Sequence, residues 1–208
     1  MKKRNLIAIA GAGVLFSACI PSVNPFYTSK DIVFDARLLG EWQEKGKSNE
    51  DKSDIGDVWK FEKADTNAYK LTVTEKEGKQ GEFTAHLFKL KQEYFLDLIP
   101  ADCNYATNQA DLVGFAMFPG HLLVRVPQVE PELKLAFFDF DWLGKYLEKN
   151  PKALAHRREG QDDKGILLTA GTRDLQKFVL KHLGEGELFD KPGVMVRKTS
   201  NSPAATPR

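Results

Sequence analysis

The stretch VWKFEKADTNAYKLTVTEK, residues 58–76, indicates the fold class of this protein. In its first half Trp59 and Phe61 alternate with charged residues, and in its second half Tyr69, Leu71 and Val73 alternate with polar ones. Residues two apart lie on one face of a β-strand, so each half predicts a strand with one buried and one solvated face. The intervening DTN favours a turn, because Asp and Asn side chains hydrogen-bond to nearby backbone. The stretch therefore predicts an antiparallel hairpin.

Similar short strands follow along the chain. They are separated by Gly, Pro or charged breaks, and they are EFTAHLFKL (82–90), YFLDLI (94–99), HLLVRV (121–126), LKLAFFDF (133–140), LAHRRE (154–159), GILLTA (165–170) and GVMVRK (193–198). Many short strands with almost no alternation with helices favour an antiparallel meander that curls into a barrel or a sandwich. We therefore expect a mainly β fold.

Two short helices are expected within this pattern. The segment DWLGKYLEKN (141–150) has apolar residues on one side and is followed by a proline, which lacks the amide that a helix needs. The segment TRDLQKFVLKHLG (172–184) carries an apolar stripe, with Thr172 as the expected N-cap and Gly184 as the expected C-cap. We expect this C-terminal helix to pack its stripe on the sheet.

Composition limits the classes of function. The 208 residues are 42% hydrophobic and 28% charged, which is typical of one globular domain. The segment before Cys19 carries three basic residues and no acidic one, so the remainder holds 27 Lys and Arg against 29 Asp and Glu. A nearly neutral body offers no clustered positive face for phosphates, which argues against nucleic acid as a partner.

The N-terminus has the parts of a secretion signal. Three basic residues precede an uncharged apolar stretch, residues 6–16, which is followed by the small residues SAC (17–19). The apolar stretch is too short for a membrane-spanning helix, which needs about 20 residues. Ordinary cleavage after Ala18 would place the bulky Phe16 three residues before the cut, where small side chains are preferred. The pattern therefore favours a different cleavage site.

The tetrapeptide FSAC, ending at Cys19, resembles the lipobox of bacterial lipoproteins, with Phe16 where that family usually has leucine. The resemblance implies that the Cys19 thiol carries diacylglycerol, that residues 1–18 are a signal peptide, and that the new amino group is often acylated. Two or three acyl chains hold a protein at a membrane. Ile20 stands where aspartate is the inner-membrane retention signal, so the resemblance implies the outer membrane, facing the periplasm. A plain secreted protein or an uncleaved signal anchor is the alternative.

The remaining chain divides by composition into three parts. We expect a tether at 19–30, which is rich in proline and small polar residues, and a disordered tail at 199–208, which has few apolar residues. Between them, residues 31–198 are expected to form a single β-rich domain. If Cys19 is lipidated, Cys103 has no partner for an internal disulfide, so the stability of the domain comes from its core.

The segment DARLLGEW (35–42) resembles the Gly-x-Trp opening of lipocalins and other calycins, with Gly40 and Trp42 in the motif positions. The resemblance implies an antiparallel barrel in which Trp42 packs across a closed end. The family also carries an arginine near its last strand, to which the sequence alone assigns no residue. An unrelated antiparallel barrel or sandwich is the alternative.

The interior of such a barrel is the expected ligand site. The chain has 14 Phe, and several strands are apolar on both faces, so a closed sheet would be either packed solid or able to hold a small apolar molecule. Residues 100–120, the longest break in the strand pattern, are interpreted either as a flap over the ligand or as a segment that completes the core. The candidate ligand-binding residues are Trp42, Phe88, Phe115 and Phe118.

Few residues favour catalysis. Cys103 has no histidine near it in sequence to form a thiolate, and Asp139 and Asp141 are explained more simply as residues at the start of a helix. Zinc ligands are usually paired at short spacing, which is not found among the four histidines His86, His121, His156 and His182. We therefore expect no catalytic residue, no metal site and no cofactor.

These patterns together predict a lipid-anchored, non-catalytic lipoprotein of the cell envelope that binds a small hydrophobic molecule or a partner protein. The alternative is a structural or assembly factor of the envelope with a solid β core. An enzyme that uses Asp139, Asp141 or Cys103 is the least favoured reading.

Overall fold

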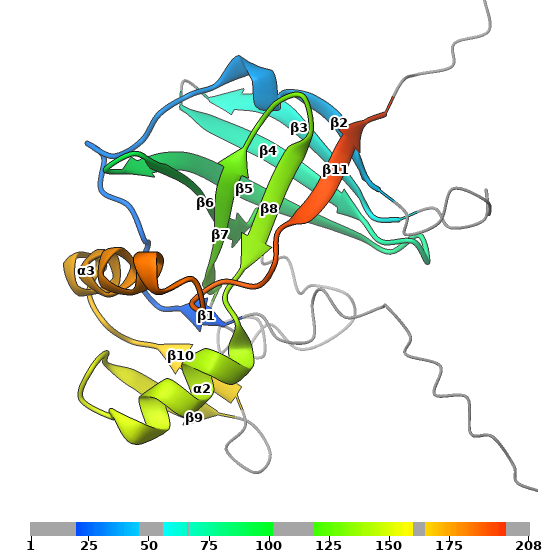
Figure 1. Cartoon of the computed structure of the whole chain (residues 1–208). Coiled ribbons are helices and arrows are strands. Elements are labelled where there is room, and N and C mark those ends of the chain that lie inside the picture. The colour runs from blue at the N-terminus through cyan, green and yellow to red at the C-terminus, as the bar shows by residue number, and fades with distance from the viewer. Residues whose placement is uncertain (1–19, 46–55, 66, 102–118, 160–164, 199–208) are drawn as a thin grey trace, which may run out of the picture.

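The computed structural model describes residues 20–45, 56–65, 67–101, 119–159 and 165–198. Its main feature is a closed antiparallel barrel of eight strands (Figure 1). The strands are β2 (Gly40–Glu44), β3 (Val58–Asp65), β4 (Ala68–Thr74), β5 (Gln80–Leu90), β6 (Glu93–Pro100), β7 (His121–Gln128), β8 (Leu133–Phe137) and β11 (Gly193–Arg197).

The barrel is a meander closed by its last strand. Each strand from β2 to β7 pairs antiparallel with the next one along the chain, and β11 pairs with both β8 and β2. The predicted hairpin is formed by β3 and β4, with Trp59 opposite Val73 and Phe61 opposite Leu71. The mainly β prediction is thus confirmed, and of its two alternatives the barrel is the correct one.

A smaller layer extends from one side of the barrel (Figure 1). The short strand β1 (Pro21–Ser22) pairs with the first residues of β7, and β10 (Gly165–Leu168) and β9 (His156–Glu159) continue the sheet beyond it. Two helices accompany this layer, α2 (Phe140–Lys149) and α3 (Thr172–His182). All of it except β1 comes from the chain between β8 and β11.

The two predicted helices form, with differences at their caps. Asp139 is the N-cap of α2 and accepts a hydrogen bond from the backbone N–H of Trp142 at 2.7 Å, as expected for Asp at a helix start. In α3 the N-cap is Gly171, because the Thr172 hydroxyl donates instead to a backbone carbonyl of the N-terminal segment at 2.7 Å. A 3-10 turn, η3 (Leu183–Glu185), extends α3, so the left-handed residue that ends it is Gly186 rather than Gly184.

The hydrophobic core has two parts. The first fills the barrel, and its largest members are Trp42, Trp59, Phe61 and Tyr69. The second lies between the outer face of the barrel and the smaller layer, and it joins residues of β5, β6 and β7 to the apolar stripe of α3. The C-terminal helix therefore packs on the sheet, as predicted. Both faces of the central strands are buried, which explains their apolar character.

One end of the barrel is closed by Trp42. The indole N–H donates to the carbonyl oxygen of Leu38 at 2.8 Å, and the Arg197 guanidinium lies over the ring, 4.3 Å from its centroid. Arg197 also donates to the carbonyl oxygens of Leu39, at 2.9 Å, and Arg37, at 2.6 Å. This arginine of the last strand thus fastens the 3-10 turn η1 (Ala36–Leu38) to the barrel. The closed eight-strand barrel is consistent with a calycin-like fold.

Residues 20–30, which composition suggested as most of a tether, lie in the folded body. Ile20 and Phe26 are buried in the second part of the core. The Asn24 amide donates to the carbonyl oxygen of Ala170 at 3.0 Å, and the backbone N–H of Phe26 donates to the Asp97 carboxylate at 2.8 Å. Proline and polar residues are compatible with order here because specific protein groups, rather than water, satisfy their hydrogen bonds. Residues 1–19 and the predicted tail at 199–208 lie outside the described residues.

Candidate functional site

The expected ligand site was the interior of the barrel, and at its open end the described residues form a small cavity. Its apolar lining includes Trp59, Phe137 and Met195, and its volume is about 50 Å³. Pockets for small molecules measure roughly 300–1,000 Å³. Among the described residues, the cavity at this mouth is therefore well below the size range of small-molecule sites.

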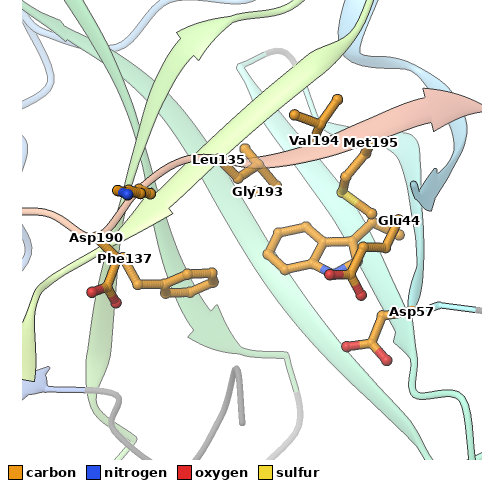
Figure 2. A pocket seen from close by; sticks show the side chains of 10 residues that line it. Glu44, Asp57, Leu135, Phe137, Asp190, Gly193, Val194 and Met195 are labelled. Atoms are coloured by element: carbon orange, nitrogen blue, oxygen red, sulfur yellow. The ribbon is translucent and has the colours of Figure 1, made fainter. Parts of the chain in front are cut away.

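The rim of the barrel mouth is acidic. Figure 2 shows the carboxylates of Glu44 and Asp57 on one side of the opening and that of Asp190 on the other. Burial raises the pKa of Asp190, and the negative charges of Asp139 and Asp141 raise that pKa further. The negative charges of these carboxylates would repel any anionic molecule at the mouth.

A larger cavity lies outside the barrel, between α2, α3 and the segments 152–155 and 169–171. We call it the α2–α3 groove, and its volume is about 520 Å³. It runs along one face of α3, where Asp174, Phe178 and Lys181 lie on successive turns. The groove therefore has the volume of a small-molecule site, and the chain segment between β8 and β11 supplies all of its lining.

Aromatic rings form the wall of the groove. The His182 ring lies between Tyr146 and Phe178, with centroid distances of 4.7 and 4.6 Å, and Tyr146 is stacked on Trp142 at 5.0 Å. His182 is only 2% exposed, and its Nδ1 lies 2.6 Å from a carboxylate oxygen of Glu185. Its Nε2 has no hydrogen-bond partner among the described residues. The sequence presents His182 only as one of four histidines without paired spacing, and it gives no sign of this burial.

The rim of the groove is basic. Lys152, Lys177 and Lys181 line it and are exposed, whereas Asp174 is the one acidic residue in its lining. No side chain caps the N-terminus of α3, which begins beside the groove at Gly171. The amide groups of an uncapped first turn add a partial positive charge. The groove therefore differs from the barrel mouth in both volume and charge.

A second group of polar residues, beside the N-terminal segment, has a structural role. Asp97 is fully buried on the outer face of β6, where one carboxylate oxygen accepts the backbone N–H of Phe26 and the other lies 2.6 Å from Nδ1 of His121. Nearby, the Tyr27 hydroxyl lies 3.2 Å from Nδ1 of His86. The group ties the N-terminal segment to the barrel.

The electrostatics of this group follow its burial. Burial lowers the pKa of His86, with the Asp97 charge opposing that shift, and burial together with the same charge raises the pKa of Tyr27. Within the described residues, no set of three or more His, Cys, Asp or Glu side chains is arranged to hold a metal ion. In the sequence, the role of Asp97 is indicated only by its position as the single charged residue of the apolar strand YFLDLI.

Two of the four predicted ligand-binding residues, Trp42 and Phe88, lie in different parts of the core. Trp42 lies inside the barrel, whereas Phe88 lies on its outer face in the other part of the core. Phe115, Phe118 and Cys103 lie outside the described residues. Sequence reasoning missed the α2–α3 groove, because its lysines and alanines are common residues whose proximity arises only from the fold.

Within the described residues, none of the helices is long and apolar enough to cross a membrane. Comparison with known proteins found no family model, no curated protein and no solved structure that matches this chain. The arguments for its function therefore rest on its own residues and geometry.

Proposed function

We propose that this protein is a lipid-anchored, non-catalytic binding protein of the cell envelope, with a calycin-like barrel as scaffold and its ligand in the α2–α3 groove. The observation that carries the proposal is the difference between the two cavities, about 520 Å³ in the groove and about 50 Å³ at the barrel mouth. Only the first lies within the range of small-molecule sites. The groove also combines an aromatic wall with a few polar groups at its rim, as such sites do.

The calycin-like assignment is supported by the meander order and by the Arg197 guanidinium over Trp42. In calycins that hold a ligand inside the barrel, the interior must be open, whereas the interior here is occupied by large side chains. The barrel in this proposal is a rigid support. Binding is assigned to the segment inserted between β8 and β11.

The anchor is assigned to Cys19, on the resemblance of FSAC to a lipobox and the apolar stretch before it. Ile20, the residue after it, supports placement in the outer membrane, facing the periplasm. Because Ile20 is buried and β1 begins at Pro21, an acylated Cys19 would hold the folded body directly at the membrane surface. Two or three acyl chains would make this attachment lasting.

The anchor predicts a defined result for Cys19→Ser. We expect this variant to incorporate no radiolabelled palmitate in a bacterial host and to appear either uncleaved or in the soluble fraction, because serine lacks the thiol that is acylated. The matched control is Cys103→Ser, which removes the other cysteine and should label normally. Labelling of Cys19→Ser at the level of the parent protein would contradict lipidation at this position.

The groove predicts that Ala155→Trp abolishes binding of a neutral aromatic probe, N-phenyl-1-naphthylamine, measured by its fluorescence. Ala155 is exposed and lines the groove, and its backbone carbonyl accepts hydrogen bonds from the N–H groups of Thr169 and Ala170. A tryptophan there should fill the cavity without breaking these bonds. The expected loss is at least tenfold in affinity, equivalent to about 1.4 kcal/mol.

The matched control is Arg173→Trp, which adds the same ring to α3 at a residue that does not line the groove and whose side chain is 84% exposed. This control should bind like the parent protein. Equal binding by the parent and Ala155→Trp would contradict a groove site. No binding by the parent would favour the alternative of a structural or assembly factor with a solid core.

A further inference from the structure

We infer that the ligand of the α2–α3 groove is an anionic amphiphile, a molecule with an apolar body and a single carboxylate or phosphate head. This inference rests on the proposed function, because it names the chemical class that the same groove selects. It is carried by the arrangement of charge and apolar surface around the cavity. The chemistry of the head and that of the body can each be assigned to particular residues.

The head of the ligand is assigned to the lysine side of the groove. Lys177 and Lys181 lie four residues apart on α3 and so project from the same face of the helix, and Lys152 comes from the segment before β9. The cavity is therefore bordered by cations from two sides. The single acid in the lining, Asp174, lies 3.9 Å from the Lys177 ammonium, so it offsets only part of this charge. The net field favours one negative group.

The body of the ligand is assigned to the apolar wall. Tyr146 and Phe178 present their rings to the cavity, and Leu154, Ala153 and Ala170 complete the apolar surface. Each Å² of apolar surface that a ligand buries here contributes about 25 cal/mol. A small inorganic anion would leave this wall uncovered, and a neutral hydrocarbon would leave the lysines without a partner. An amphiphile satisfies both parts.

The barrel mouth provides an internal comparison for this inference. It has an apolar lining as well, but its rim carries Glu44, Asp57 and Asp190 against the single cation Lys191. An anionic amphiphile would be repelled there. The barrel mouth and the α2–α3 groove therefore have opposite charge preference, and of these two cavities only the groove favours an anion.

The inference is tested with two probes that share one body. The neutral N-phenyl-1-naphthylamine and the anionic 8-anilino-1-naphthalenesulfonate differ by a sulfonate group, and both fluoresce on entering an apolar site. We expect the parent protein to bind the anionic probe more tightly. The triple variant Lys152→Gln, Lys177→Gln, Lys181→Gln should lose roughly tenfold in affinity for the anionic probe at low salt, while its affinity for the neutral probe stays within twofold.

Two controls make the result specific. The variant Lys60→Gln, Lys76→Gln, Lys79→Gln removes three lysines of the barrel strands and turns that do not line the groove, and it should bind both probes like the parent protein. Raising salt to about 1 M, where the Debye length is about 3 Å, should reduce the affinity for the anionic probe and leave that for the neutral probe unchanged. Ala155→Trp should abolish the binding of both.

The outcomes separate this inference from the proposed function. Equal binding of both probes, insensitive to the three groove lysines and blocked by Ala155→Trp, would overturn the anionic preference and leave the groove site standing. Failure of both probes to bind would overturn the groove site itself. Displacement of the anionic probe by decanoate or decyl phosphate, and not by decanol, would support the class, and the better competitor of the two identifies the head group. Displacement by decanol as strong as that by decanoate would overturn it.

Discussion

Replacement of Trp42 with alanine is expected to lower the free energy of unfolding by about 3–5 kcal/mol, the range for removal of a large buried aromatic side chain. Trp42 is fully buried at the closed end of the barrel, where it belongs to the first barrel strand, β2, and pairs with Arg197 of the last, β11. Its loss removes a hydrogen bond to Leu38 and leaves the Arg197 guanidinium without the ring beneath it. Urea unfolding followed by far-ultraviolet circular dichroism measures the change.

Two further variants divide the effect of Trp42 into its parts. Trp42→Phe keeps an aromatic ring and loses the indole N–H, so it should lower the free energy of unfolding by less than the alanine variant does. Arg197→Gln removes the cation from the face of the ring, a contact worth about 0.5–2 kcal/mol. A value below about 1 kcal/mol for Trp42→Ala would contradict a role in closing the barrel.

Much of the barrel could be predicted from the sequence, because strand patterns are local. In β3 and β4 one side chain in two must face the core, and this period is visible in any single strand. The closure of the barrel was harder to predict from the sequence. It depends on β11, which pairs with β2 across more than 150 residues of chain, and no local pattern identifies that pairing.

The candidate groove could not be predicted for a related reason. Tyr146, Lys152, Thr169 and Lys177 belong to four separate stretches of chain, and none of them forms a motif with its neighbours in sequence. For residues 20–30 the composition predicted a tether, although these residues lie in the folded body. Their prolines and polar groups resemble a flexible tether, yet the segment is held by residues far away in sequence, such as Asp97, which lies 71 positions from Phe26, and Ala170.

Asp97 therefore predicts the second large effect. Asp97→Ala removes the acceptor of the buried backbone N–H of Phe26 and the partner of the part-buried His121 Nδ1, which lies 2.6 Å from a carboxylate oxygen of Asp97. A carboxylate oxygen accepts, so the His121 tautomer with the proton on Nδ1 makes this hydrogen bond. Each buried donor left without a partner destabilises a fold by about 1–3 kcal/mol. We expect a loss of roughly 2–5 kcal/mol in the free energy of unfolding.

The suitable control for Asp97 is Glu82→Ala, which breaks an exposed ion pair of similar length with Lys70 and should change stability by less than about 1 kcal/mol. Unfolding by urea compares the two variants.

Asp97→Asn keeps one acceptor for Phe26 and can donate to His121 if that ring changes tautomer, so it should lie between the parent protein and Asp97→Ala. Hydrogen exchange gives the sharper readout, because a fastening role predicts that Asp97→Ala speeds the exchange of the Phe26 amide more than that of amides in the barrel core. Unchanged protection of that amide would show that the N-terminal segment is held by its apolar contacts alone, through Ile20 and the Phe26 ring.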